Sequence, residues 1–202
     1  MSLRNTEKSY GSVAKWLHWL TALLFLFSYV TVYYRHWFTE SGSSENWTAL
    51  QLHLSIGVSI AVVVSLRIFW RVLNKQPQPE PGNRLEHMAA TLGHYALYAV
   101  MIMMPITGYL GTGAATEFFY LFEIPKFEDT ALFQSIKADN PGLIFKEFEK
   151  PFDYLHKNIG GKWLVWILIL GHAAAAMYHH FVKRDRTLRK MTFDKKAREP
   201  EA

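Results

Sequence analysis

The sequence contains no cysteine and few charged residues, and each shortage excludes a class of protein. Without cysteine there is no disulfide framework, no iron–sulfur cluster held by thiolates and no haem attached through a C-x-x-C-H motif. Charged residues make up only 19% of the 202 residues, against about 25% in a typical soluble domain. Half of the residues are hydrophobic. The composition therefore favours a membrane protein, and the length is typical of a single domain.

Four apolar segments are long enough to cross a bilayer. We expect spans at about 14–36, 48–74, 86–112 and 162–183, because about 20 apolar residues in a helix cross a hydrocarbon core of about 30 Å. The segments are apolar on all sides, whereas the helices of a soluble bundle carry polar stripes. The sequence therefore predicts an all-α membrane protein, with a four-transmembrane-helix bundle that forms one membrane domain over residues 1–202.

The distribution of Lys and Arg predicts the orientation of these spans. Basic residues are concentrated before the first span, in the connection after the second and in the tail at 184–202. Loops rich in Lys and Arg stay on the cytoplasmic side. We therefore expect both termini to be cytoplasmic and a long outer loop, at about 113–161, between the third and fourth helices. Because the basic residues flank apolar segments, we expect membrane lipids as partners and no nucleic acid.

Histidines inside the spans are the candidate functional residues. His18, His53, His94 and His172 fall within them. Ionisable residues in membrane helices are costly and point to function. Two neutral imidazoles saturate a haem iron for electron transfer. Depth along the spans pairs His18 with His172 for an inner haem, and His53 with His156 for an outer one. The sequence therefore predicts two haem b groups.

Neighbouring residues suit this arrangement. Gly57 follows His53 by one helical turn, where a small residue lets a flat porphyrin approach. Arg67 lies deeper on nearly the same face of the second span, close to the inner haem. It either pairs with a haem propionate or snorkels to the cytoplasmic interface. His94 either has a second-shell or quinone-site role or serves packing alone.

Each histidine also has a structural alternative. A single histidine in a membrane helix can act as a hydrogen-bonding group between helices. We expect solvated roles at the cytoplasmic interface for His87, His179 and His180. His36 is expected at the outer interface, with ligation of the outer haem as the alternative.

Several stretches resemble the bacterial cytochrome b561 family of four-helix, di-haem membrane cytochromes. They are WLHWL at 16–20, LHLSIG at 52–57, RIFWR at 67–71, GHYALY at 93–98, PITGY at 105–109, HAAAA at 172–176 and the ending HHF at 179–181 with RDRTLRKM at 184–191. The resemblance covers nearly the whole chain except the enlarged outer loop. It implies haem ligands that pair the first helix with the fourth and the second with the fourth, in the bacterial inner membrane. Members of the family exchange electrons with the quinone pool, and some oxidise superoxide.

One spacing departs from that resemblance. His156 and His172 are 16 residues apart, which places them about 160° apart around a uniform α-helix. They could not then both face the bundle interior. We therefore expect the helix to break at Gly160 and Gly161, which leaves His156 on a preceding turn.

The first functional hypothesis is a di-haem b cytochrome that transfers electrons between the quinone pool, with ubiquinone as the candidate quinone, and an outer-side redox partner. Superoxide is one candidate partner, although the outer loop carries five Lys against eight Asp and Glu. That balance suits a basic redox protein better than an anion. The alternative is a haem b membrane-anchor subunit of a larger dehydrogenase or hydrogenase complex. A third is a haem-free transporter or structural protein. Whether the chain is an enzyme stays open.

Overall fold

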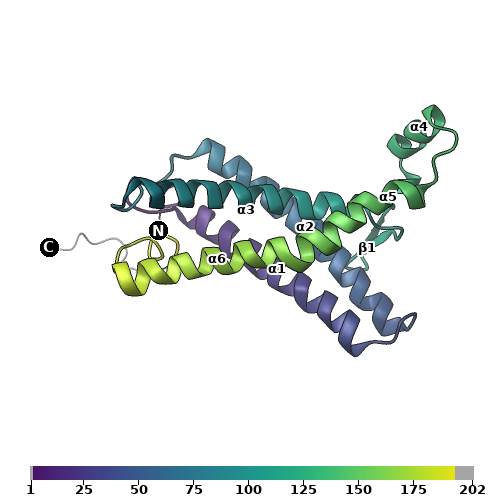
Figure 1. Ribbon diagram of the computed structural model, residues 1–202, viewed down its shortest axis with the longest axis horizontal. Helices are drawn as coiled ribbons and strands as arrows, with labels where there is room; N and C mark the ends of the chain where they lie inside the picture. Colours follow the sequence, from purple (N-terminus) through teal and green to yellow (C-terminus); the bar gives the residue numbers. More distant parts are fainter. Residues whose placement is uncertain (1, 194–202) are drawn as a thin grey trace. The chain divides into compact units, whose positions relative to one another are not determined.

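The computed structural model describes residues 2–193 and is mainly helical. Within that range four helices are long and apolar enough to cross a membrane: Ser12–Phe38 (α1), Ser44–Leu73 (α2), Arg84–Leu110 (α3) and the continuous helix Phe145–Lys183 (Figure 1). This confirms the all-α, four-helix membrane fold. The side of the membrane that holds each terminus stays a prediction.

The fourth helix begins well before the predicted span. It starts with α5 (Phe145–Tyr154), continues as a π-helix η2 (Leu155–Leu164) and α6 (Val165–Tyr178), and ends in a short π-helix η3 (His179–Lys183). The predicted span at 162–183 lies inside it, and so does the last part of the predicted loop at 113–161. No break occurs at Gly160 or Gly161, so the expected interruption of the helix is wrong.

The chain divides into two compact units, which we describe one at a time. The first comprises residues 1–21, 63–99 and 165–202, and the second comprises residues 22–62 and 100–164. The prediction of a single membrane domain stays a prediction.

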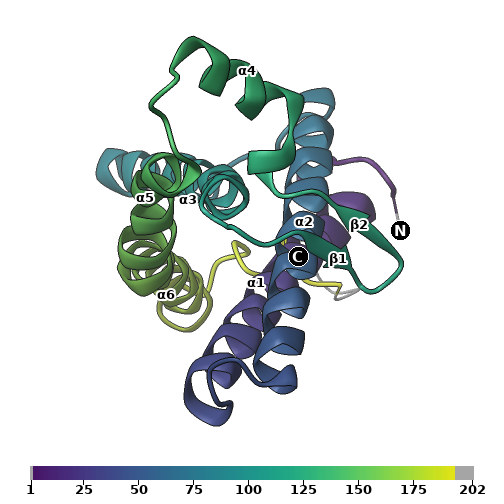
Figure 2. The ribbon, with the colours of Figure 1, turned by 90° about the vertical axis from the view of Figure 1, so that its right-hand side faces the viewer.

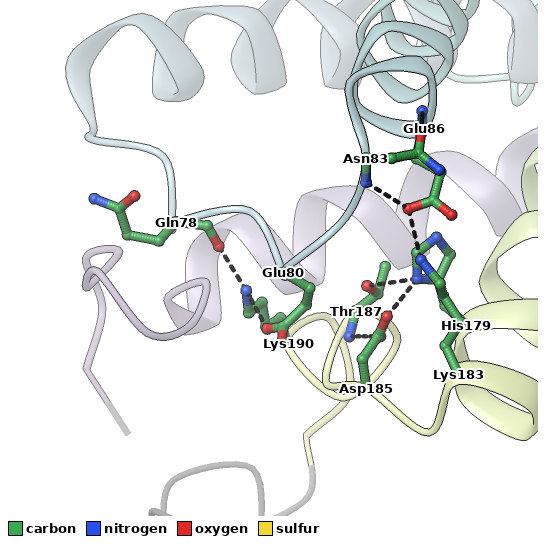
Figure 3. A network of polar contacts seen from close by, with 9 residues as sticks. All are labelled: Gln78, Glu80, Asn83, Glu86, His179, Lys183, Asp185, Thr187 and Lys190. Carbon is green, nitrogen blue, oxygen red and sulfur yellow. Dashed lines mark hydrogen bonds and ion pairs between the residues drawn. The ribbon is translucent and has the colours of Figure 1, made fainter.

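In the first unit the N-terminal segment, the α2–α3 connection and the C-terminal segment are tied together by polar contacts. The Trp19 indole donates a hydrogen bond to the Met191 carbonyl at 3.0 Å. Lys190 forms an ion pair with Glu80 and donates to the Gln78 carbonyl at 2.6 Å (Figure 3). The Lys190 and Glu80 side chains are only 10% and 16% exposed, and charges this buried require a partner.

The start of α3 is fixed by a reciprocal cap. The Asn83 side chain accepts a hydrogen bond from the Glu86 backbone N–H at 2.9 Å, and the Glu86 carboxylate accepts one from the Asn83 N–H at 3.1 Å. This is the capping-box arrangement. Lys183, at the end of η3, also donates to Glu86 at 2.6 Å (Figure 3). The cap of α3 therefore also holds the end of the fourth helix.

His179 departs from the expected solvated role. Its Nδ1 lies 2.5 Å from the Asp185 carboxylate, and its side chain is 25% exposed. Thr187 donates its backbone N–H to the same carboxylate at 2.8 Å. The left-handed residue Arg184, with a φ of 54°, turns the chain after η3 so that Asp185 meets His179. The expectation of a solvated histidine is wrong here because the C-terminal segment folds back over it.

The second unit holds the folded segment that precedes the fourth helix. It contains a two-stranded antiparallel hairpin, β1 (Thr116–Phe118) with β2 (Phe122–Ile124), a 3-10 turn η1 (Phe127–Asp129) and the helix α4 (Ala131–Asp139) (Figure 2). Phe127, Phe133 and Phe145 form a buried aromatic cluster. The predicted loop is therefore a small structure with its own core.

Candidate functional site

His53 on α2 and His156 on η2 face each other in the second unit. Their ring centroids are 6.1 Å apart and the ring planes differ by 77°. Nδ1 of His53 lies 3.2 Å from the Ser28 carbonyl oxygen, and Nδ1 of His156 lies 3.0 Å from that of Met104. A carbonyl only accepts, so each Nδ1 carries the hydrogen and each Nε2 keeps its lone pair. That is the tautomer that a metal-binding histidine needs.

The π-helix η2 explains how His156 reaches this position. The predicted 160° discrepancy assumed uniform α-helical winding between His156 and His172. A π-helix winds about 4.4 residues per turn, or about 82° per residue. Over the eight steps from His156 to Leu164 it therefore turns about 140° less than an α-helix, and this shortfall accounts for most of the discrepancy.

Two glycines allow η2 and α3 to approach closely around His156. A Cβ built on Gly108 of α3 would lie 2.9 Å from Cε1 of His156. A Cβ on Gly160 of η2 would overlap the Met104 sulfur atom. Real side chains do not tolerate such contacts. The absence of a side chain at Gly108 therefore makes room for the His156 ring, and Gly160 lets η2 pack against Met104.

A second pair of rings lies in the first unit. His18 on α1 and His172 on α6 also have centroids 6.1 Å apart, with an interplanar angle of 56°. His94 on α3 lies 5.8 Å from His172 on the same measure. The structure thus brings together the predicted pairs, His18 with His172 and His53 with His156, and adds His94 beside the first pair.

The ring separation distinguishes metal ligation from a direct hydrogen bond. An imidazole nitrogen lies about 2.0 Å from a bound metal and about 1.2 Å from its own ring centre, so imidazoles on opposite sides of one metal have centres about 6.4 Å apart. A direct hydrogen bond of about 2.9 Å would bring the centres to about 5.3 Å. The 6.1 Å of both pairs is closer to the metal-bridged value.

The surface beside His53 suits a flat group such as a porphyrin. Gly57 lies one turn further along α2, on the same face, and a Cβ built on it would meet no other atom within 4 Å. The open space beside Gly57, on the face of α2 that carries His53, would admit a flat group such as a haem.

In the first unit Arg67 contacts the His18 ring. Its guanidinium donates to Nδ1 of His18 at 2.9 Å, and it lies 5.4 Å from the centre of the Tyr98 ring. Arg71 lies at the same distance from that ring. Because arginine only donates, Nδ1 of His18 is here the acceptor. Ligation through Nε2 requires a protonated Nδ1, so metal binding at His18 requires Arg67 to release this contact.

Several contributing residues were not identified from the sequence. Ser28 and Met104 act through their backbone carbonyls, which leave no trace in residue type. Tyr98 lies in the stretch GHYALY at 93–98, which resembles the family, so the sequence did carry a signal for this residue. Tyr10 precedes the first helix and hydrogen-bonds Arg71. Burial raises the pKa of the Tyr10 phenol, although Arg71 acts in the opposite direction.

Comparison with known proteins identifies the family. A family model described as prokaryotic cytochrome b561 matches residues 9–194. The chain belongs to the prokaryotic cytochrome b561 family. Like its family, this cytochrome is a haem b-binding electron-transfer protein of the membrane, and with its four helices it is a multi-pass protein of the bacterial inner membrane. These expectations from the sequence are confirmed.

Individual relatives agree with this assignment. The cytochrome is 30% identical to cytochrome b561 homolog 2 of Escherichia coli (strain K12), with 95% of each chain covered. It is 26% identical to cytochrome b561 homolog 1 of the same organism, over 87% of this chain and 92% of the relative. It is 25% identical to the probable superoxide oxidase CybB of Yersinia pestis, over 92% and 96%.

Proposed function

We propose that this cytochrome binds two haem b groups and transfers electrons between the quinone pool and a redox partner on the outer side. His18 and His172 hold the inner haem, and His53 and His156 hold the outer one. The observation that carries the proposal is the common 6.1 Å separation of the two pairs of rings. Bound haem supplies one-electron chemistry, and bis-histidine ligation leaves no open position for oxygen.

The protein contributes orientation and dielectric to this chemistry. The carbonyls of Ser28 and Met104 fix the tautomers of His53 and His156 and hold their rings in place. At the other pair, Arg67 provides a cation next to His18. Once it releases His18, its guanidinium is placed to pair with a haem propionate, since arginine and carboxylate form strong bidentate contacts. Its contacts with His18 and Tyr98 support this role over snorkelling.

The position of His94 supports a role for this residue next to the inner haem. Its ring centre lies 5.8 Å from that of His172. The ring spacing alone would therefore allow either His94 or His18 to bind the inner haem together with His172. The resemblance to the family favours a ligand on the first helix. We therefore assign His18 as the ligand and His94 as a neighbour of the haem or of a quinone headgroup, with ubiquinone as the candidate quinone.

The charge of residues 113–161, the predicted outer loop, supports a protein partner over superoxide. Three of its lysines already pair with acids: Lys126 with Glu128, Lys150 with Glu147 and Lys157 with Asp153. Such pairing weakens the cationic funnel that would attract an anion. A basic redox protein suits this surface better. Superoxide remains a candidate partner because one relative is named a probable superoxide oxidase.

The second candidate is a haem b membrane-anchor subunit of a larger dehydrogenase or hydrogenase complex. The folded segment with its own aromatic core favours it, because a docking surface needs a defined shape. Purification from native membranes discriminates between the two. A stoichiometric peripheral subunit supports the anchor, and a lone chain that reduces a quinone analogue supports the electron carrier.

The haem count of purified variants tests the ligand assignment. A pyridine haemochrome assay should give two haems per chain in the wild type and one in alanine variants of His18, His53, His156 and His172. Low-temperature spectra should show the same haem missing from the His18 and His172 variants. His36→Ala and His94→Ala serve as controls that keep both haems. Two haems in His18→Ala with one in His94→Ala would reassign that ligand, and two haems in His156→Ala would remove His156.

A further inference from the structure

The connection between β1 and β2 combines a strained turn with an exposed aromatic tip. Phe119 and Tyr120, the central residues, have φ values of 46° and 60°. Such a turn normally uses Asn-Gly, because bulky side chains are disfavoured in the left-handed region. Strain of this kind persists only where the surroundings impose it, and it often marks a functional feature.

Two fully buried polar side chains of α2 impose this conformation. Gln51 donates its amide to the Ala115 carbonyl at 3.0 Å and accepts the Glu117 N–H at 2.8 Å. The Ser55 hydroxyl donates to the Glu117 carbonyl at 3.2 Å and accepts the Phe119 N–H at 3.0 Å. Both side chains have no exposed surface. The hairpin is therefore fixed to the side of α2.

The contacts give the direction in which the hairpin points. As β1 advances from Ala115 to Phe119, its partners on α2 advance from Gln51 to Ser55, so the tip points along α2 away from Ser44. Ser55 lies about 16 Å from Ser44 along the helix axis. The 30 residues of α2 span about 45 Å, and a hydrocarbon core of about 30 Å leaves about 7 Å outside at each end. Ser55, and the tip beyond it, thus fall within the depth of the core.

The tip has the surface that such a position requires. Its exposed side chains are apolar or aromatic: Phe119 at 41%, Tyr120 at 57%, Leu121 at 77% and Phe122 at 56%. The Tyr120 and Leu121 N–H groups donate to the carbonyls of Glu117 and Phe118 at 3.2 and 3.0 Å. An unpaired backbone N–H group is costly in a membrane, and non-helical backbone is tolerated there where it is packed against protein, as this hairpin is against α2. In this turn the amides of residues 119–121 all have partners.

The charged residues of the hairpin lie further from the tip. Glu117 and Glu123 are directly opposite each other in the register, one pair beyond Phe118 and Phe122. Opposed like charges are unfavourable on a sheet and are tolerated best where water or headgroups screen them. The hairpin therefore runs from a polar base to an apolar tip.

We propose that the β1–β2 hairpin is a re-entrant membrane anchor, which inserts residues 119–122 among the lipids of the leaflet on the side where α2 begins. The partner is the acyl region of that leaflet, and the carboxylates of Glu117 and Glu123 reach back from the base of the hairpin toward the headgroups. Gln51 and Ser55 connect this anchor to α2 on either side of His53 in the sequence. The anchor thus joins the lipid surface to the helix that carries a proposed haem ligand.

The absence of cysteine from the chain allows a direct test. Leu121→Cys carries a nitroxide spin label in the full-length holoprotein, reconstituted in vesicles of phosphatidylethanolamine and phosphatidylglycerol. Collision rates with oxygen, which partitions into lipid, and with a water-soluble nickel chelate report its depth. Val62→Cys, at an exposed position of α2, is the lipid-facing reference, and Lys137→Cys on α4 is the water-facing reference.

The expected result is a label at 121 that collides with oxygen severalfold more often than with the nickel chelate, as at 62. A label that behaves like the one at 137 would place the tip in water and overturn the proposal. A label shielded from both reagents would show contact with protein, either a partner or a second copy, and would overturn it too. Phe122→Cys replaces Leu121→Cys if that variant fails to fold. The readout is independent of the haem count, so it distinguishes this proposal from the proposed function.

Discussion

His156 donates its Nδ1 hydrogen to the carbonyl oxygen of Met104, 3.0 Å away on α3. This one contact fixes the tautomer of the ring, so that Nε2 keeps its lone pair, and the ring lies 6.1 Å from that of His53. A histidine that merely linked two helices would use one nitrogen in this way and have no second histidine at metal-bridging distance. His53 is oriented by Ser28 in the same manner. Both rings thus have the tautomer that the proposed ligation of the outer haem would use.

Gly108→Ala is expected to remove the outer haem. The new Cβ would lie 2.9 Å from Cε1 of His156, so the imidazole must move away from the position opposite His53. The haem content should fall from two to about one per chain, with the inner haem spectrum unchanged. Gly142→Ala is the matched control, since a Cβ there meets nothing within 4 Å. Full haem content in Gly108→Ala would mean that the ring tolerates the shift and that its packing is not what positions the ligand.

Arg67→Gln is expected to lower the midpoint potential of the inner haem. A cation near the haem favours the reduced iron, which carries one positive charge fewer. Its removal should lower the potential by about 60 mV, which is a tenfold change in the one-electron equilibrium. Redox titration followed at the two haem bands measures this shift.

Arg67→Lys provides the charge-conserving control for this prediction. The midpoint potential of the inner haem should stay close to the wild-type value in Arg67→Lys, because lysine keeps the positive charge. Lysine cannot form the bidentate contact that a guanidinium makes with a carboxylate. The outer haem should be unaffected in both variants. Equal potentials in the wild type and Arg67→Gln would place the guanidinium away from the haem and restore the snorkelling alternative.

The main fold could be predicted from the sequence because apolar length alone sets it. The predicted spans 14–36, 48–74 and 86–112 begin and end within a few residues of the ends of α1, α2 and α3. The pairing of His18 with His172 followed from depth, since a helix rises by a constant amount per residue. These inferences depend on one-dimensional regularities that a sequence carries directly.

The π-helix in the fourth helix and the left-handed turn of the hairpin could not be predicted from the sequence, because tertiary contacts produce them. The π-helix at Leu155–Leu164 forms where Gly160 packs against Met104, which brings together residues more than 50 positions apart. The left-handed Phe119 and Tyr120 depend on Gln51 and Ser55 in the same way. Residue types at these positions predict an α-helix with a break and an ordinary loop. The structure does bring His156 close to His53, but through a π-helix and not through a break at Gly160 and Gly161.

Acidification is expected to release the C-terminal segment. Burial raises the pKa of the Asp185 carboxyl, but hydrogen bonds from His179 and Thr187 lower it by more, so that it lies below its ordinary value. Asp185 therefore contributes stability above the ordinary carboxyl pKa of about 3.9, and this contribution is lost as the pH falls through the lower folded value. The protection factors of the amides at 184–193, which correct for the intrinsic pH dependence of hydrogen exchange, should fall below about pH 4.

Asp185→Asn should show low protection factors in this segment already at neutral pH, with little further change down to pH 3. Asp139→Asn, on the exposed end of α4, is the control and should follow the wild type. An identical pH profile in Asp185→Asn and the wild type would assign the acid transition to another carboxylate.

Lys190→Met is expected to destabilise the first unit more than the loss of a surface ion pair would. The Lys190 and Glu80 side chains are 10% and 16% exposed, so the substitution leaves a buried carboxylate without its cation. Breaking a buried pair costs about 3 kcal/mol, whereas replacing both charges is often nearly neutral. The double variant Lys190→Met with Glu80→Gln should therefore recover most of the loss, and unfolding in mixed micelles measures both. Lys137→Met, on α4, is the surface control and should change stability by less than about 0.5 kcal/mol. Equal losses in the single and double variants would contradict the burial argument, because they would show that the Lys190 contact with the Gln78 carbonyl, rather than the ion pair, holds the three segments together.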